Sequence, residues 1–391
     1  MAWVRIGVAA AVMVIIAVRK QAFLAHPQFW AEDGAIFFVR ADTHPLHGWE
    51  LLFEPYQGYL HLVPRIIAAL GYGLPLRSIP EYYQIVGLIA AGLTAWTLQS
   101  PRIRLPGAWV AAFGMALLPH SGEVYLTLCN LQWIGAIALS GLLIAEDAST
   151  RNQRVGDSVL LGLIGLTGPF VVLWLPLFAW RTWRRRSRWS TILLGIAVLC
   201  SVIQAPSLLN RPRSEDDDQP VQIANGIEVA SRRLILSTYA GKLETGRAGA
   251  VALSLGAICL LAVALRRRRR ELPGAGMLAL AGVLVLGAVT YKARLDTLDF
   301  GDLFNGDRYY FVPKVQLCWL VGAVALADRG AIRWIAALCT VLPWVVNAPR
   351  AIYPAGADKH WPEAAARIEA GEWTHVDILP DGSSFEHIGR R

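Results

Sequence analysis

Apolar runs long enough to cross a bilayer recur from one end of the 391-residue sequence to the other. A helix needs about 20 mostly apolar residues to span the hydrocarbon core, because it rises about 1.5 Å per residue through about 30 Å. A soluble core requires no such repetition, so we predict an all-α, multi-pass integral membrane protein. We place eleven transmembrane helices near residues 3–20, 80–98, 107–119, 131–146, 157–169, 170–183, 190–206, 247–265, 273–290, 308–327 and 331–346.

A twelfth apolar segment, 59–74, is interrupted by His61, Pro64 and Arg65. If it does not span and the N-terminus is cytoplasmic, sixteen arginines fall in short loops on one side, as the positive-inside bias requires. They are Arg102, Arg104, Arg151, Arg154, Arg181, Arg184, Arg185, Arg186, Arg188, Arg266, Arg267, Arg268, Arg269, Arg270, Arg329 and Arg333. We therefore predict that 59–74 forms a helix along the outer membrane face. Topology accounts for the net charge of +8, so no nucleic-acid partner is needed.

This topology divides the chain into a transmembrane domain, 1–346, and a short external tail, 347–391. It leaves a first external loop, 21–79, and a later one, 207–246. The tail contains a predicted helix near 361–370 and a predicted strand near 373–379. It is too short to fold as an independent domain.

The first external loop contains two adjacent carboxylates, Glu32 and Asp33, within a run of large apolar residues. Acidic side chains at the edge of a bilayer are energetically unfavourable unless they are solvated or paired, and those that are retained often have a functional role. A functional role is one explanation. The alternative is that the pair caps the helix predicted to follow.

The order of these features resembles that of the C-type (GT-C) membrane glycosyltransferases. "AEDG" at 31–34 resembles the family's first-loop acidic motif. "LLGLIGLTGPFVVLWLPL" at 160–177 resembles its "KGP"-centred hairpin, with Thr167 in place of the usual lysine. "GDRYYFVPKV" at 306–315 resembles the "RY…P" start of a late span. The resemblance implies a GT-C-like fold in a bacterial inner (plasma) membrane, with an active site on the external or periplasmic face. It also implies a polyprenyl-phosphate-linked sugar donor and a glycan, glycolipid or protein acceptor.

Such a transfer requires a base for the acceptor proton and cations for the departing phosphate. Adjacent carboxylates point in different directions, so Glu32 and Asp33 do not suit a two-carboxylate hydrolase. We expect one to act as the base and the other to position it, with a preference for Asp33, and an in-line displacement would invert the anomeric centre. The motifs require no metal, and a divalent cation at the acidic pair stays an open alternative.

The candidate phosphate ligands are Arg65, Arg308 and Lys314. Arginine presents a planar fork that suits phosphate, and a lysine inside an apolar span must face a cavity or a partner. A simple ion pair between Asp307 and Arg308 is the alternative at that position. Candidate substrate contacts, which could also be ordinary interface residues, are His61, Tyr56, Gln57, Tyr59, Glu123 and Tyr309.

Two other functions fit many spans and buried cations. A lipid-linked saccharide transporter or flippase would need the same membrane domain but no catalytic carboxylate. An O-antigen-type polymerase usually has its key external loop in the middle of the chain. The acidic pair directly after the first helix therefore favours the transferase.

Overall fold

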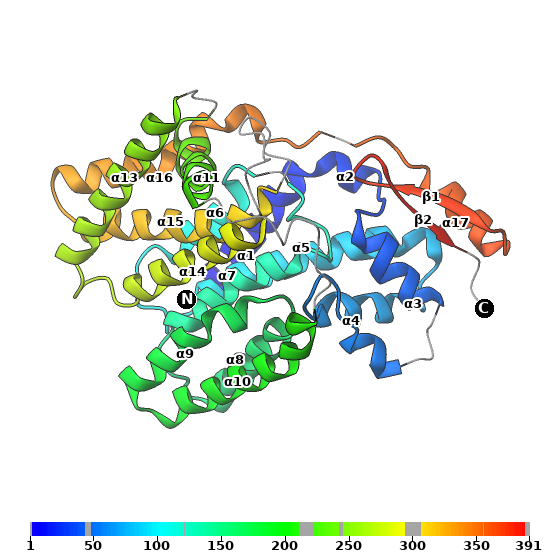
Figure 1. The fold of residues 1–391 in the computed structure, drawn as a ribbon, viewed down its shortest axis with the longest axis horizontal. Helices are drawn as coiled ribbons and strands as arrows, with labels where there is room; N and C mark the ends of the chain where they lie inside the picture. The colour runs from blue at the N-terminus through cyan, green and yellow to red at the C-terminus, as the bar shows by residue number, and fades with distance from the viewer. Residues whose placement is uncertain are drawn as a thin grey trace.

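In a computed structural model, the described part of the chain forms a bundle of helices with one two-stranded sheet (Figure 1). The structure describes residues 2–43, 48–120, 122–210, 223–241, 245–293, 306–354 and 356–387. Parts of the predicted external loop 207–246, namely 211–222 and 242–244, lie outside the described residues.

Each of the eleven predicted spans corresponds to a helix. These are α1 (Ala2–Arg19), α5 (Ile79–Leu98), α6 (Ala108–Leu117), α7 (Leu131–Ile144), α8 (Arg151–Gly165), α9 (Phe170–Arg185), α10 (Arg188–Leu209), α13 (Arg247–Arg267), α14 (Ala275–Ala293), α15 (Arg308–Ala327) and α16 (Ala331–Val346). Four of them, α1, α10, α13 and α15, are long and apolar enough to cross a membrane. The ten residues of α6 rise only about 15 Å, so the count of eleven spans stays a prediction.

The segment 59–74 contains one short helix, α4 (Leu62–Gly71). Its ten residues are about half the length needed to cross the hydrocarbon core, which agrees with the prediction that it does not span. The rest of the first loop is built from short pieces: α2 (Gln21–Ala25), the π-helix η1 (Asp33–Phe38), α3 (Val39–Thr43), and the 3-10 helices η2 (Gly48–Phe53) and η3 (Leu76–Ser78).

The centre of the bundle is α7, in which all fourteen residues are buried. It packs against α15, and Gln316 donates a 2.8 Å hydrogen bond to Ser140 between the two helices. The outer helices instead expose large apolar side chains, such as Trp3, Leu260 and Trp334. Because a water-facing helix places polar residues on its outer surface, this apolar surface fits contact with lipid.

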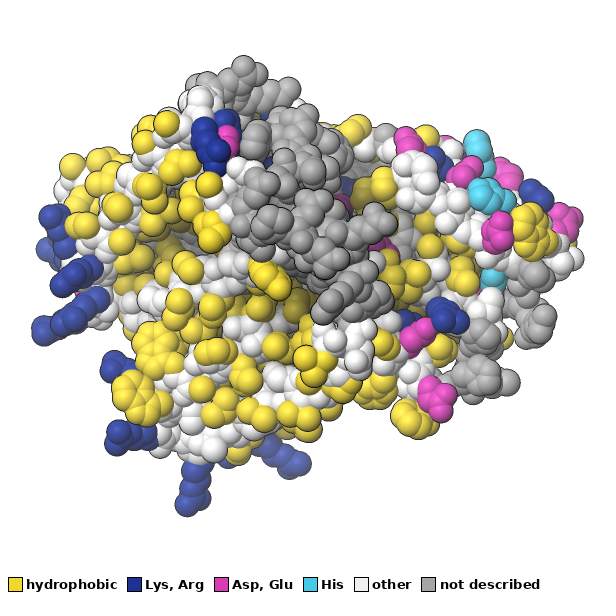
Figure 2. Space-filling model, in the orientation of Figure 1, with side chains coloured by type: hydrophobic (Ala, Val, Ile, Leu, Met, Phe, Trp, Pro, Cys, Tyr) yellow, Lys and Arg dark blue, Asp and Glu magenta, His cyan; other side chains and the backbone are white. Residues whose placement is uncertain are grey.

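Charge is separated along the long axis of the molecule. Figure 2 shows Lys and Arg along the left edge, and Asp, Glu and His interspersed with a few Lys and Arg around the right edge, with apolar side chains between them. The loops 181–188 and 266–270 supply ten arginines to what we call the basic end. The predicted topology makes this the cytoplasmic end.

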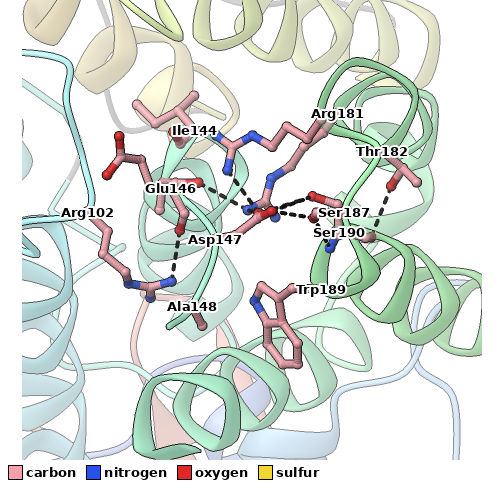
Figure 3. Close-up of polar contacts among 12 residues, drawn as sticks. Arg102, Ile144, Glu146, Asp147, Ala148, Arg181, Thr182, Ser187, Trp189 and Ser190 are labelled. Atoms are coloured by element: carbon pink, nitrogen blue, oxygen red, sulfur yellow. Dashed lines mark hydrogen bonds and ion pairs between the residues drawn. The ribbon is translucent and has the colours of Figure 1, made fainter. Parts of the chain in front are cut away.

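A polar network fixes three helices at the basic end (Figure 3). Asp147, just after α7, accepts hydrogen bonds from Arg181 at 2.8 Å, Arg185 at 3.0 Å and Ser190 at 3.0 Å, and one from Ser187. Ser187 also caps α10, because its hydroxyl accepts from the backbone N–H of Ser190. The ends of α7, α9 and α10 are thereby tied to one carboxylate.

The C-terminal tail packs against the first external loop. It forms α17 (Trp361–Glu369) and an antiparallel pair, β1 (Thr374–Ile378) and β2 (Ser383–His387), so the predicted helix and strand are confirmed and the second strand is new. The ring of Trp361 lies 4.7 Å from Phe29 and 5.6 Å from Phe38, between ring centroids. Figure 1 shows the tail beside α2 and α3, so loop and tail lie on the same side of the molecule.

Candidate functional site

The acidic pair follows a tight turn that the tail holds in place. Ala31 has a φ of 36°, a conformation that is costly for a residue with a side chain. Its N–H donates to the carbonyl of Leu379, and the N–H of Leu379 donates back to Phe29 O at 3.1 Å. Contacts made by the tail therefore set the direction in which the two carboxylates point.

Asp33 is buried and bound to the backbone of a distant loop. Its two carboxylate oxygens accept hydrogen bonds from the N–H groups of Leu128 and Cys129, each at 2.8 Å. Burial raises the pKa of Asp33 to about 7, although both hydrogen bonds act in the opposite direction. The side chain thus ties η1 to the buried segment 122–130 that precedes α7.

Glu32 points elsewhere, as expected for adjacent side chains. It is half-buried, and the hydroxyl of Tyr56 donates to its Oε1 at 3.5 Å. Glu32 is therefore more accessible from outside the protein than Asp33, which is 3% exposed.

A two-residue hairpin positions the tyrosines beside Glu32. Tyr56 and Tyr59 exchange backbone hydrogen bonds of 3.0 and 3.3 Å across Gln57 and Gly58, whose φ angles of 53° and 85° fit a type I′ turn. Gln57 is exposed at the tip, while the hydroxyl of Tyr59 accepts a hydrogen bond from Gln132 at 3.2 Å.

The Tyr59 hydroxyl lies where charges from two elements meet. Burial raises the pKa of Tyr59 to about 12, the nearby Glu32 also raises it, and the nearby Arg308 lowers it. Both Glu32 and Arg308 are therefore within electrostatic range of this one hydroxyl. The first-loop hairpin and the start of α15 also meet in space, because Tyr59 and Tyr309 line the same cavity.

Arg308 is held by Glu123. Its Nη1 lies 2.6 Å from Glu123 Oε2, and its guanidinium lies 5.2 Å from the ring centroid of Tyr309. The Glu123 side chain is only 5% exposed, whereas that of Arg308 is 33% exposed. The pair therefore anchors the arginine and leaves part of its fork accessible.

Lys314 does not lie open to a ligand. Its Nζ contacts both carboxylate oxygens of Asp307 at 2.9 Å and the carbonyl of Pro119 at 3.0 Å. An ammonium group has three N–H donors, and these three contacts account for them. Asp307 thus pairs with Lys314, and Arg308 pairs with Glu123, in place of the alternative pairing of Asp307 with Arg308.

Arg65 is buried against a different carboxylate. It lies 3.1 Å from Glu54 Oε2 and donates to the Glu54 carbonyl at 2.9 Å, while Arg40 contacts the same carboxylate at 2.8 Å. His61, which precedes α4, is also buried, and its ring lies 4.7 Å from that of Tyr59. Arg65 therefore supports the loop, and Arg308 is the most accessible of the three predicted phosphate ligands.

The turn between α8 and α9 supports this part of the loop. The hydroxyl of Thr167 accepts from the N–H of Val63 at 3.0 Å, and the N–H of Gly168 donates to Leu60 at 2.9 Å. Thr167 stands where the resemblance expects lysine, and here it caps the start of α4. The turn between α8 and α9 therefore holds the segment that contains Tyr59 and His61.

A small apolar cavity adjoins the tyrosines. It has a volume of about 60 Å³ and lies among α7, α9, α14 and α15. Tyr59, Gln132 and Tyr309 form its polar part, and Phe170, Leu173 and Val289 are among its apolar walls. The cavity therefore lies between the tyrosines of the candidate site and α9 and α14, two helices with apolar outer faces.

Two contributing residues, Lys20 and Cys129, were not predicted as site residues. Lys20 is buried with its Nζ 4.5 Å from the ring centroid of Phe23 and within electrostatic range of Glu123. Cys129 comes from the segment before α7. An aromatic-rich sequence around Lys20 was the available signal, whereas the contacts of Cys129 depend on packing.

The described residues contain no group of three or more His, Cys, Asp or Glu side chains arranged to hold a metal ion. Comparison with known proteins adds no assignment: no family model, no curated protein and no solved structure matches this chain.

Proposed function

We propose that this protein is a membrane glycosyltransferase of the C-type fold. It would transfer a sugar from a polyprenyl-phosphate donor to an acceptor hydroxyl at the end of the molecule opposite the basic end, which the predicted topology makes external. The observation that carries the proposal is that two tyrosines from different parts of the chain line one apolar cavity. Tyr59 belongs to the hairpin whose Tyr56 bonds to Glu32, and Tyr309 is the ring next to Arg308. The motif resemblance supports it.

The donor phosphate would bind the exposed part of the Arg308 guanidinium. Glu123 fixes one edge of the fork at 2.6 Å, so the arginine is preorganised and loses little freedom when a phosphate binds. The start of the polyprenyl chain would lie against the apolar residues of α9 and α14 that line the cavity. As the phosphate leaves it gains negative charge, and a fixed cation stabilises that charge without reorganising.

The acceptor oxygen attacks the anomeric carbon on the face opposite the phosphate. A new C–O bond forms, the bond between the anomeric carbon and the phosphate oxygen breaks, and its electron pair stays on the phosphate. The acceptor proton passes to a carboxylate, and the configuration inverts. We assign the base to Glu32, because Asp33 is buried and its two oxygens each accept a backbone N–H. Asp33 then acts as a positioning residue.

The test compares two amide variants in purified full-length protein supplied with a panel of polyprenyl-phosphate sugars. Glu32→Gln should lower kcat by roughly 10²-fold or more, the usual contribution of a general base. Asp33→Asn should act mainly on stability and much less on kcat, because the Asp33 side chain is buried and bonds two backbone N–H groups. Glu50→Gln changes an exposed acid in the same loop and serves as the matched control.

Full activity in both Glu32→Gln and Asp33→Asn would overturn the catalytic role of the pair. A large loss of kcat in Asp33→Asn alone, with stability intact, would move the base to Asp33. Movement of the intact donor between leaflets without bond cleavage would favour a flippase.

A second comparison addresses the phosphate. Arg308→Ala should reduce both donor affinity and kcat, while Arg65→Ala should act mainly through stability, because Arg65 contacts Glu54. Unchanged donor affinity and rate in Arg308→Ala would remove the arginine from the phosphate site.

A further inference from the structure

A larger cavity lies among α13, α15 and α16, away from the candidate site. Its volume is about 440 Å³, and its walls are almost entirely apolar, with Leu260, Val321 and Ile335 as representatives of the three helices. Residues Ile235 and Tyr239, from η5 (Ser231–Leu236) and α12 (Ser237–Tyr239), also line it. The volume falls within the roughly 300–1,000 Å³ typical of ligand pockets.

The cavity occupies the part of the bundle next to the basic end. On α16 its lining runs from Ile332, the second residue of the helix, to Leu342. That is a rise of about 15 Å, or half of a hydrocarbon core about 30 Å thick. On α13 the lining reaches Arg267, the last residue of the helix. The cavity therefore matches the depth of one leaflet, the predicted cytoplasmic one.

Positive charge borders this cavity. Arg267 is the only charged residue in its described lining, and it stands within the run Arg266–Arg270. Arg268 is neutralised by Glu271 at 2.9 Å and Asp328 at 3.0 Å. The exposed Arg267 has no ion pair with any residue in the described ranges. Asp328, the partner of Arg268, is within electrostatic range of Arg267 but makes no ion pair with it. An apolar slot with an exposed arginine at its edge complements an apolar chain that ends in an anion.

We propose that this cavity binds an anionic phospholipid of the cytoplasmic leaflet, with one acyl chain in the slot and the phosphate on Arg267. The charge complementarity selects an anionic headgroup over a zwitterionic one, by roughly fivefold for each arginine that contacts it. The polyprenyl donor of the proposed reaction is not the occupant. Its phosphate would be at Arg308, whereas the lining of α15 begins at Leu317, about 13 Å further along the helix.

The experiment is native mass spectrometry of the full-length protein with palmitoyl-oleoyl-phosphatidylglycerol or the matching phosphatidylcholine. We expect phosphatidylglycerol to be retained more strongly. Arg267→Gln should reduce its retention roughly fivefold, whereas Arg184→Gln, an exposed arginine at the end of α9, should not.

A second pair of variants tests the slot itself. Ala257 lines the cavity and is exposed, so Ala257→Trp should fill it and abolish retention of the lipid. Ala262→Trp places the same bulk at an exposed position of α13 outside the lining and should leave retention unchanged. Because the readout is lipid binding, it is independent of sugar transfer.

Equal retention of the two lipids would overturn the proposal, as would unchanged binding in both Arg267→Gln and Ala257→Trp. Displacement of phosphatidylglycerol by an equimolar amount of a polyprenyl phosphate would also overturn it, because the slot would then belong to the donor.

Discussion

Removing the Trp361 side chain should release the C-terminal tail from the first external loop. The indole is 2% exposed, packs on Phe29 and Phe38, and donates its Nε1–H to the carbonyls of Leu76 and Arg77 at 3.2 Å. Replacing a buried tryptophan by alanine costs about 3–5 kcal/mol. If the tail opens as a local unit, its open population should rise by roughly 10²- to 4 × 10³-fold.

Hydrogen exchange measured by mass spectrometry reads this opening directly. Trp361→Ala should lose protection in peptides from 361–387, while peptides from α7 keep theirs. Trp373→Ala is the matched control, because this tryptophan belongs to the same tail but is 55% exposed. Since Leu379 bonds to the turn before Glu32, sugar transfer should also fall in Trp361→Ala. If the tail of Trp361→Ala were as protected as that of the wild type, Trp361 would not be what docks the tail. If protection fell equally throughout the bundle, the tail would not open as a local unit.

Three further results are expected. Burial raises the pKa of Asp33 from 3.8 to about 7, so its protonated form favours the fold; this stabilisation is complete below about pH 4 and is lost as the pH rises through 7. The free energy of unfolding of the wild type should therefore decline relative to that of Asp33→Asn over that range, by up to ~4 kcal/mol. An equal change of melting temperature with pH in the two proteins would contradict this. Gly34→Ala would place a methyl group 2.9 Å from Phe385 Cε1 and should cost about 1–3 kcal/mol, whereas Gly73→Ala meets nothing within 4 Å; equal melting temperatures for the two variants would count against the packing. Ser384→Cys should react with an impermeant thiol reagent in intact cells and Arg269→Cys should not, and the reverse pattern would invert the topology.

The sequence by itself determined the helices and much of their order. Each predicted span contains a helix, and the tail helix and first strand lie where they were expected. These features are local: apolar runs define the helices, and backbone groups in lipid must be bonded within their own segment. The acidic pair could also be selected from the sequence, because adjacent carboxylates in an apolar run need an explanation.

Only the tertiary structure decided which charged groups meet. Arg308 pairs with Glu123, 185 residues away, and Asp33 accepts from backbone groups 95 and 96 residues away. Lys314 is only seven residues from Asp307, so sequence spacing allowed this ion pair. Arg308, the next residue after Asp307, was the alternative partner considered for that carboxylate. Hydrophobic periodicity specifies which face of a helix is apolar. It does not specify the rotation and depth at which two distant helices pack. These two quantities decide which charged side chains come within ion-pair distance of each other.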